Sequence, residues 1–332
     1  MASQTGEPFL FMSIEIKELN KNNQPLLNKT ADELVTLLFM PGTDQTCKIS
    51  EMYSCISPEE LITAYRILHY EYMLSDDNTI TEKPTDTIES LLNTGEINEY
   101  NATEVIKYIE RKICDKRNGT EVDSDDIDNI SGCVRRLALA KIIHNSKEYI
   151  DSINNLNSLI DYNKFSTLLN ELFGSQFIGM EVRVKSLESL VQKLIRKGLD
   201  RIDSAGDIIG IRIVTQDIST TDVMQKIVHI LSVFYSVLPQ NSSEEMTYKI
   251  IDVDTNNHVS YMKIQLKING IPIEIMFSSE HQVEIGKDPS HDLCHSNYES
   301  RRAIKSTEEL KHIFDDIREK ISEKLLGSNQ FV

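Results

Sequence analysis

The sequence has no tryptophan, and only five of its 332 residues are cysteine. The cysteines are odd in number, widely scattered and free of any Cys-x-x-Cys pair, which argues against a disulfide framework or a zinc site. We interpret them as reduced thiols in the cores of a cytosolic protein. No apolar run approaches membrane-spanning length, and the N-terminus lacks the basic and apolar regions of a secretory signal. The sequence therefore predicts a cytoplasmic protein without a membrane partner.

Positive charge is also scarce, because 35 basic residues stand against 52 acidic ones, giving a formal net charge of −17. Such acidity argues against nonspecific binding to nucleic acid or anionic membranes. Residues 181–201 are the exception, with six basic and three acidic side chains. A small cationic region in an acidic protein favours a small polyanion, such as a nucleoside triphosphate, over a long nucleic acid. Charge alone is nevertheless more typical of a solvated helix face.

The length favours two domains. Periodicity predicts helices over 31–39, 57–74, 101–116, 124–145, 146–173, 187–196, 222–234 and 298–325. It predicts strands near 182–184, 208–214, 246–252, 259–268 and 271–277, and a further strand beginning at 237–238. Asn269-Gly270 is a strong hairpin turn. The fold class is therefore α/β, with a mostly helical domain over 1–174 followed by a mixed sheet flanked by helices over 175–332.

The junction between the strand at 182–184 and the helix after it gathers groups that bind phosphate. Ser186 stands where a helix N-cap belongs, and Lys197-Gly198 is typical of a helix end. Ser189 and Lys193 are four residues apart and share a face of the helix, while Arg183 and Lys185 are two apart on the strand and share a side of it. These four predicted positions converge on one corner.

Two carboxylates follow in buried strands. Asp207 opens Asp-Ile-Ile-Gly-Ile-Arg, so an acid able to hold magnesium precedes Arg212 by five residues. Glu274 shares a face with Met276 in an otherwise apolar strand, where a carboxylate needs a partner, a metal or a reacting group. Arg212 could instead form a structural ion pair with either acid, and the Ser189 and Lys193 side of the helix could be merely solvated.

The combined pattern Arg-x-Lys-x-x-x-Ser-x-x-x-Lys, followed by Asp-x-x-Gly-x-Arg, resembles the RelA/SpoT nucleotidyltransferase-like (p)ppGpp synthetases over about residues 175–305. The resemblance implies a nucleotidyltransferase-like sheet and the transfer of a diphosphate from ATP to the ribose 3′ hydroxyl of GDP or GTP. It assigns ATP binding to Arg183, Lys185, Ser189, Lys193 and Arg212. Asp207 and Glu274 would hold one Mg²⁺, and Glu274 would also act on the acceptor hydroxyl.

The acceptor side departs from the family pattern. Met276 stands where the family has glutamine, and the acceptor loop keeps only Asn256 and Ser260 of its fixed positions. His258 replaces a tyrosine that stacks on the acceptor base, and could stack in its place over a smaller area. Met262 replaces a histidine. The departures therefore bear on the identity of the acceptor more than on that of the donor.

His295 and Tyr298 match the His-x-x-Tyr-Glu run of the family and would line the edge of the site, although packing at a helix N-terminus explains them equally well. Two other functions stay open. One is the same transfer to an adenine nucleotide or a tRNA 3′ end, although the acidic charge opposes tRNA. The other is a catalytically inactive domain that binds a nucleotide or a partner.

The helical half contains no comparable motif. The RelA/SpoT hydrolase domain carries a His-Asp metal pair, and no His-Asp dipeptide occurs before residue 291. Residues 1–174 are therefore expected to form a helical domain for regulation or partner binding, through a homo-oligomer or a regulatory protein.

Overall fold

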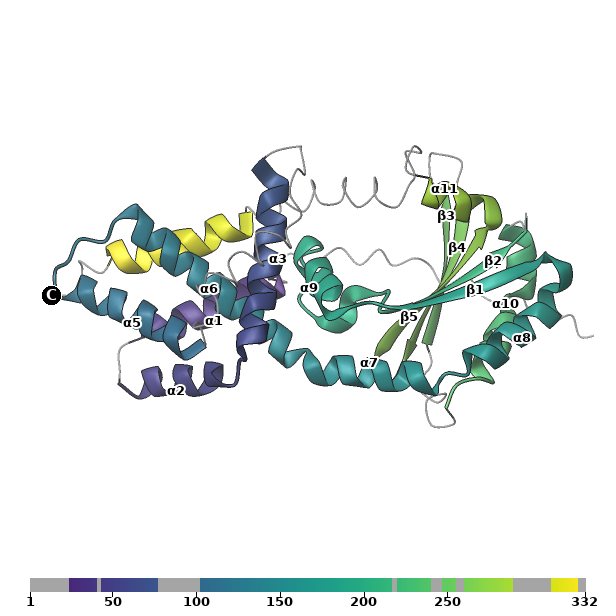
Figure 1. Ribbon diagram of the computed structural model, residues 1–332, viewed down its shortest axis with the longest axis horizontal. Helices are drawn as coiled ribbons and strands as arrows, with labels where there is room; N and C mark the ends of the chain where they lie inside the picture. The colour runs from purple at the N-terminus through teal and green to yellow at the C-terminus, as the bar shows by residue number, and fades with distance from the viewer. Residues whose placement is uncertain are drawn as a thin grey trace, which may run out of the picture.

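The computed structural model describes residues 24–40, 43–76, 102–216, 220–239, 247–254, 260–288 and 312–327. The molecule is elongated, with a helical part at one end and a sheet with its own helices at the other (Figure 1). The helical part contains α1 (Leu26–Phe39), α2 (Thr43–Ser54), α3 (Pro58–Asp76), α5 (Ala102–Arg117) and α6 (Ser124–Asn145). A last helix, residues 312–326, packs on the same part (Figure 1).

Local capping explains where several helices begin. Ser57 and Glu60 bond reciprocally at the start of α3, with the Ser57 amide donating to Glu60 over 2.6 Å. The predicted helix over 146–173 is wrong as a single element: it is divided into α7 (Lys147–Leu159) and α8 (Tyr162–Phe173). The break occurs because the Asp161 side chain accepts from the Lys164 amide and starts a new helix. The mostly polar α2 was not predicted.

The sheet has five strands: β1 (Phe177–Val184), β2 (Ile209–Thr215), β3 (Thr247–Asp254), β4 (Ser260–Ile268) and β5 (Ile271–Ser279). Their order is β1-β2-β5-β4-β3, and β2 and β5 are parallel while the other pairs are antiparallel. This mixed sheet confirms the predicted fold class. The β4–β5 hairpin turns at Asn269 and Gly270, whose φ angles of 49° and 79° require the left-handed region that this dipeptide tolerates.

Two details of the sheet half differ from expectation. The predicted strand at 237–238 is wrong, because these residues form a turn after α10 (Thr220–Tyr235). An unpredicted helix, α11 (Glu280–Lys287), follows β5 directly. Ser279 and Gln282 form a capping box at its start, which explains how a strand can pass into a helix with no loop between them.

One face of the sheet is apolar and covered. The odd-numbered isoleucines of β2 and β5 and the leucine and isoleucines of β4 pack with apolar side chains of α7, α8 and α10, as in the edge-to-face pair of Phe165 and Phe234 at 5.1 Å. The alternation of the strands leaves the even-numbered residues of β2 and β5 on the other face. That second face carries charge, and it holds the candidate site.

The C-terminal helix returns to the beginning of the chain. Its buried residues Ile313, Ile317, Ile321 and Leu325 belong to the core formed by α1, α2, α3, α5 and α6. The Arg135 guanidinium lies 4.3 Å from the centre of the Phe314 ring of this helix. The two cores therefore do not follow chain order, since α7 and α8 pack with the sheet and the last helix does not. The predicted domain division at residue 174 stays a prediction.

Ile321→Ala is expected to lower the free energy of unfolding by about 2–5 kcal/mol, because Ile321 is fully buried and its loss leaves a cavity. Leu326→Ala on the same helix is the matched control, since Leu326 is 49% exposed and its truncation is expected to cost about 0.5 kcal/mol or less. Denaturant unfolding of the full chain measures both. Equal, small losses would mean that the helix does not belong to this core.

The cysteine prediction is partly wrong. All four cysteines in the described residues are free, as expected, but Cys47, Cys55 and Cys114 are exposed and only Cys133 is buried. In that same part of the chain, no helix combines the length and apolar character needed to cross a membrane.

Candidate active site

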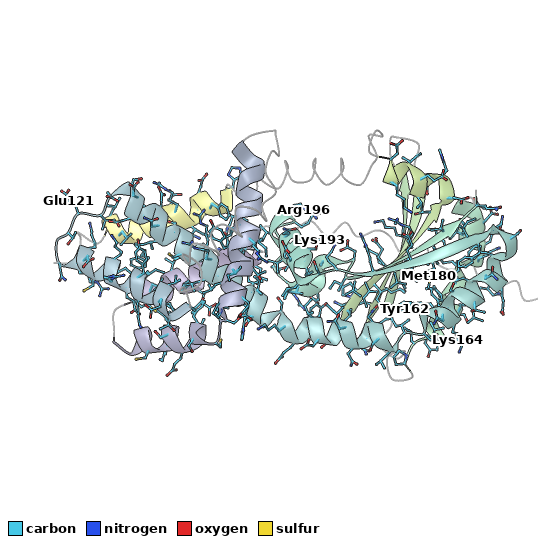
Figure 2. The ribbon with its side chains drawn as sticks, viewed as in Figure 1. Glu121, Tyr162, Lys164, Met180, Lys193 and Arg196 are labelled. Atoms are coloured by element: carbon cyan, nitrogen blue, oxygen red, sulfur yellow. The ribbon has the colours of Figure 1, made fainter. Side chains whose placement is uncertain are left out.

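The site is built around α9 (Leu187–Arg196), which joins the two cores. Its N-cap is Ser186, whose side chain accepts from the Ser189 amide, as the sequence predicts. Leu190 packs in the core of the sheet, whereas Val191 and Ile195 pack in the helical core. Figure 2 places Lys193 on this helix, between the two parts. The helix that carries the predicted phosphate ligands is therefore fixed from two sides.

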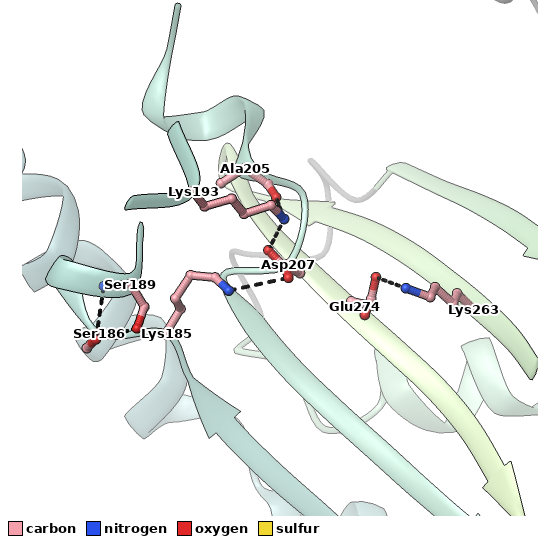
Figure 3. Close-up of polar contacts among 8 residues, drawn as sticks. All are labelled: Lys185, Ser186, Ser189, Lys193, Ala205, Asp207, Lys263 and Glu274. Carbon is pink, nitrogen blue, oxygen red and sulfur yellow. Dashed lines mark hydrogen bonds and ion pairs between the residues drawn. The ribbon is translucent and has the colours of Figure 1, made fainter. Parts of the chain in front are cut away.

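Lys193 and Lys185 converge on Asp207. Lys193 donates both to the Asp207 carboxylate and to the Ala205 carbonyl oxygen, and Lys185 Nζ lies 3.4 Å from the second oxygen of Asp207 (Figure 3). Burial lowers the pKa of the Lys193 ammonium, although the hydrogen bond and the charge of Asp207 act in the opposite direction. Asp207 thus offsets part of the desolvation of a lysine that is held away from water.

The short 3-10 turn before Asp207 (Ile202–Ala205) is tied to the sheet. Lys267 of β4 donates to Asp203 over 3.0 Å, and Arg201 forms a two-point pair with the same carboxylate. Burial acts to raise the pKa of Asp203, but the hydrogen bonds from Lys267 and Arg201 outweigh it and lower the pKa. These bonds fix the chain just ahead of Asp207.

Across the open face of the sheet, a row of paired residues runs from Arg183 on β1 through Gly210 on β2 to Glu274 on β5. The Arg183 side chain lies against Gly210, so closely that a Cβ at that position would meet Arg183 Nε at 3.1 Å. A glycine here gives the arginine a path across β2 toward Glu274. The next row pairs Glu181 with Arg212, and Arg212 with Met276.

These two rows border a cavity of about 290 Å³. It is lined by Glu181, Val182, Arg183, Gly210, Ile211, Arg212, Glu274 and Met276. Arg212 Nη1 donates to Glu181 over 3.2 Å, so its ion pair is with neither of the two acids considered from the sequence. Its Nε is buried and has no hydrogen-bond partner in the structure. The cavity therefore combines two arginines with one buried carboxylate.

Gly210→Ala tests whether the close approach of the Arg183 side chain to Gly210 has a functional role. The new methyl group is expected to displace Arg183 and to raise the KM for a phosphate-bearing donor by about tenfold, the worth of one charge-assisted contact, with little change in stability. Gly179→Ala on β1 is the matched control, since nothing lies within 4 Å of the added Cβ. Steady-state kinetics with the donor varied measures the effect. Equal KM values for the two variants would show that the close approach has no functional role.

Glu274 is 9% exposed and pairs with Lys263 of β4 at 3.1 Å (Figure 3). It also lies within electrostatic range of Lys193, which pairs with Asp207. Lysine charge therefore reaches Glu274 from two directions, from α9 and from β4. The structure thus brings Arg183, Lys193, Asp207 and Glu274 to one region, as the predicted site requires.

Comparison with known proteins identifies the family to which this region is similar. Residues 182–297 match the family model described as "Region found in RelA / SpoT proteins". The chain carries a RelA/SpoT domain. Over 164 residues it is 27% identical to GTP pyrophosphokinase YwaC from Bacillus subtilis (strain 168), a match that covers 44% of this chain and 70% of that relative.

Two solved structures are similar to part of the chain. The crystal structure of the small alarmone synthetase 1 from Bacillus subtilis matches with a TM-score of 0.30 and 17% identity, over 54% of this chain and 97% of that one. The same synthetase bound to its product pppGpp matches with a TM-score of 0.30 and 17% identity, over 52% and 96%.

Most of the predicted acceptor residues lie outside the part of the chain that the structure describes. Asn256, His258, His295 and Tyr298 lie outside the described residues. Ser260 is the first residue of β4, and its side chain is also outside the described part. Their predicted roles stay predictions. Ser189 lies at the start of α9, where its hydroxyl accepts from Ser186 over 3.0 Å.

Sequence reasoning missed Lys263 and Lys267, the two lysines of β4 that bind acids of the RelA/SpoT domain. The alternation of this strand could have located them, because Lys263, Gln265 and Lys267 alternate with the buried Ile264 and Leu266. Which acid each lysine would meet depends on strand register, which the motif does not give.

The acidic groups suit a hard cation with few protein ligands. No cluster of three or more His, Cys, Asp or Glu side chains that could hold a metal occurs in the part of the chain that the structure describes. Asp207 and Glu274 provide two carboxylates beside a cationic cavity. This donor set fits Mg²⁺, which keeps several waters and shares its remaining positions with substrate phosphates.

Proposed function

We propose that the RelA/SpoT domain is an ATP-dependent pyrophosphokinase that transfers a diphosphate to the ribose 3′ hydroxyl of GDP or GTP, making (p)ppGpp. The observation that carries the proposal is the open sheet face. Arg183 and Arg212 line one cavity with Glu274, and Lys193, which pairs with Asp207, lies within electrostatic range of the same glutamate. The match to the RelA/SpoT family model and to the relative named GTP pyrophosphokinase supports this chemistry.

In the proposed reaction, the 3′ oxygen of the acceptor attacks the β-phosphorus of ATP. The new bond joins the 3′ oxygen to that phosphorus, the bond from the β-phosphorus to the bridging oxygen of the α-phosphate breaks, and AMP leaves. Such a transfer depends mostly on positioning and on neutralising phosphate charge. The cations around the cavity meet both requirements.

Arg183, Lys185 and Lys193 bind the triphosphate, and Ser189 adds a neutral donor at the N-terminus of α9, where the helix dipole favours anions. The buried Nε of Arg212, unpaired in the structure, is a further donor for ATP. Lys185 and Lys193 hold Asp207 in the absence of nucleotide and exchange that partner for phosphate oxygens when ATP binds.

Asp207 and Glu274 would hold one Mg²⁺, and the ion would supply positive charge to the phosphate oxygens. Glu274 also accepts the proton of the attacking hydroxyl. Its burial holds the carboxylate in the lining of the cavity, where the acceptor ribose has to lie. Removing divalent cations with a chelator is therefore expected to abolish transfer.

The product assay separates this function from its alternatives. Purified protein is incubated with ATP, Mg²⁺ and one acceptor at a time, GDP, GTP, ADP or uncharged tRNA, and the nucleotides are resolved by chromatography. We expect guanosine tetra- or pentaphosphate with GDP or GTP. Transfer to ADP or tRNA alone would identify a different acceptor, and no product from folded protein would indicate an inactive domain.

A further inference from the structure

Lys263 of β4 is not part of the Arg-x-Lys-x-x-x-Ser-x-x-x-Lys, Asp-x-x-Gly-x-Arg or acceptor-loop patterns. Its ammonium lies 3.1 Å from Glu274 Oε2, while in the strand register Lys263 stands opposite Met276, so it reaches diagonally to the glutamate. The two β5 residues beside it, Glu274 and Met276, both line the cavity. Its side chain is 22% exposed, so part of it is in contact with solvent.

Lys263 lies on the opposite side of Glu274 from the donor-side cations. Arg183 approaches Glu274 from β1 across Gly210, and Lys193 approaches from α9, whereas Lys263 comes from β4. The strand β4 starts at Ser260, directly after the segment that carries the predicted acceptor residues. Lys263 is thus the cation nearest in the chain to the acceptor loop, three residues after Ser260, the last position of the loop that matches the family.

A charged acceptor needs such a cation. The phosphates of a nucleotide that approaches two carboxylates are repelled by them unless a positive group lies on the same side. The donor-side cations are already engaged by the triphosphate of ATP in the proposed reaction. Lys263 can exchange Glu274 for a phosphate oxygen, as we propose that Lys185 and Lys193 exchange Asp207.

We propose that Lys263 binds the 5′ phosphate chain of the acceptor, so that the site selects a nucleoside polyphosphate over an uncharged nucleoside. This inference rests on the proposed function, of which it defines the acceptor side. If the Lys263–Glu274 ion pair were purely structural, its loss would instead displace Glu274 and lower activity equally with every acceptor.

The experiment compares wild type, Lys263→Gln and Lys263→Arg with GDP and guanosine as acceptors. One charge-assisted contact to phosphate corresponds to about 10- to 100-fold in affinity. In Lys263→Gln we expect the KM for GDP to rise by about that factor, with the KM for ATP and the kcat/KM for guanosine unchanged. Lys263→Arg keeps the charge and is expected to recover most of the affinity for GDP. An equal loss of kcat with both acceptors would overturn the proposal.

Equilibrium binding of GDP, measured by calorimetry without ATP, separates this inference from the proposed function. Weaker binding to Lys263→Gln supports the role of Lys263 even if wild type transfers nothing, whereas active wild type with unchanged GDP binding and KM in the variant refutes the role of Lys263 alone. Absence of GDP binding to wild type also refutes it. Lys164→Gln is the control, because Lys164 is exposed on α8, at the far end of the sheet part from Lys193 (Figure 2). It is expected to match wild type throughout.

Discussion

Glu274→Gln is expected to lower kcat by about a thousandfold while the protein stays folded. Glutamine keeps the shape of the side chain and can still accept a hydrogen bond from Lys263, but it neither takes a proton nor binds a cation strongly. Loss of a general base alone costs about 10²- to 10⁴-fold, and Glu274 is assigned both roles. The substitution should therefore have the largest effect of any in the site.

The measurement is the initial rate of transfer at saturating ATP and acceptor, with thermal unfolding recorded for each variant. Glu171→Gln is the control, because Glu171 is an exposed acid of α8, on the covered side of the sheet, and the same chemical change there should leave kcat unaltered. A Glu274→Gln protein that keeps more than a tenth of the wild-type kcat would rule out Glu274 as the base and metal ligand.

Lys193→Met is expected to lower kcat/KM for ATP by about 100-fold or more. The substitution removes a cation from the triphosphate, which costs about 10- to 100-fold for one charge-assisted contact. It also leaves Asp207 with only Lys185 as a described partner and removes the bond to the Ala205 carbonyl. The second effect adds to the first, because Asp207 is then held by one lysine fewer before ATP binds.

The control for this variant is Lys197→Met. Lys197 is an exposed lysine one turn further along, at the end of α9, and its side chain has no contact with the site residues in the part of the chain that the structure describes. Varying ATP at saturating acceptor gives both constants. If the two variants lose the same small factor, the cationic face of α9 acts through general charge and not through the contact between Lys193 and Asp207.

The donor side of the site could be predicted because its geometry is local. Ser189 and Lys193 share a helix face by spacing alone, and Ser186 caps that helix through its own side chain. Strand alternation likewise places Glu274 and Met276 on one face, and both line the cavity. Short-range rules of this kind hold whatever the rest of the chain does.

The parts that could not be predicted depend on contacts distant in sequence. The partner of Glu274 is Lys263, eleven residues away across a hairpin, and the partner of Arg212 is Glu181 on a neighbouring strand. Ile317 and Ile321 of the C-terminal helix are buried in a core that also contains residues of α1, almost three hundred positions earlier in the chain. Sequence periodicity shows that such a helix has an apolar face, but not which surface will cover it.

The role of the helical part stays a prediction, as do a regulatory partner, a homo-oligomer and a cytoplasmic location. The helical part nevertheless contacts α9, the helix that carries Lys193. The Leu26 amide of α1 donates to the Leu199 carbonyl over 3.1 Å, just past the end of α9, and Ile195 of α9 is buried among the helices. Lys193 therefore stands on a helix whose position depends on both cores.

The most direct test of the central claim follows the phosphorus atoms of ATP. ATP is labelled at either its β- or its γ-phosphorus and incubated with the protein, Mg²⁺ and GDP. We predict that both labels enter the guanosine product in equal amounts and that one AMP is released for each product molecule. Release of ADP with transfer of the γ label alone, or only hydrolysis of ATP, would contradict the assignment of this site as a pyrophosphokinase.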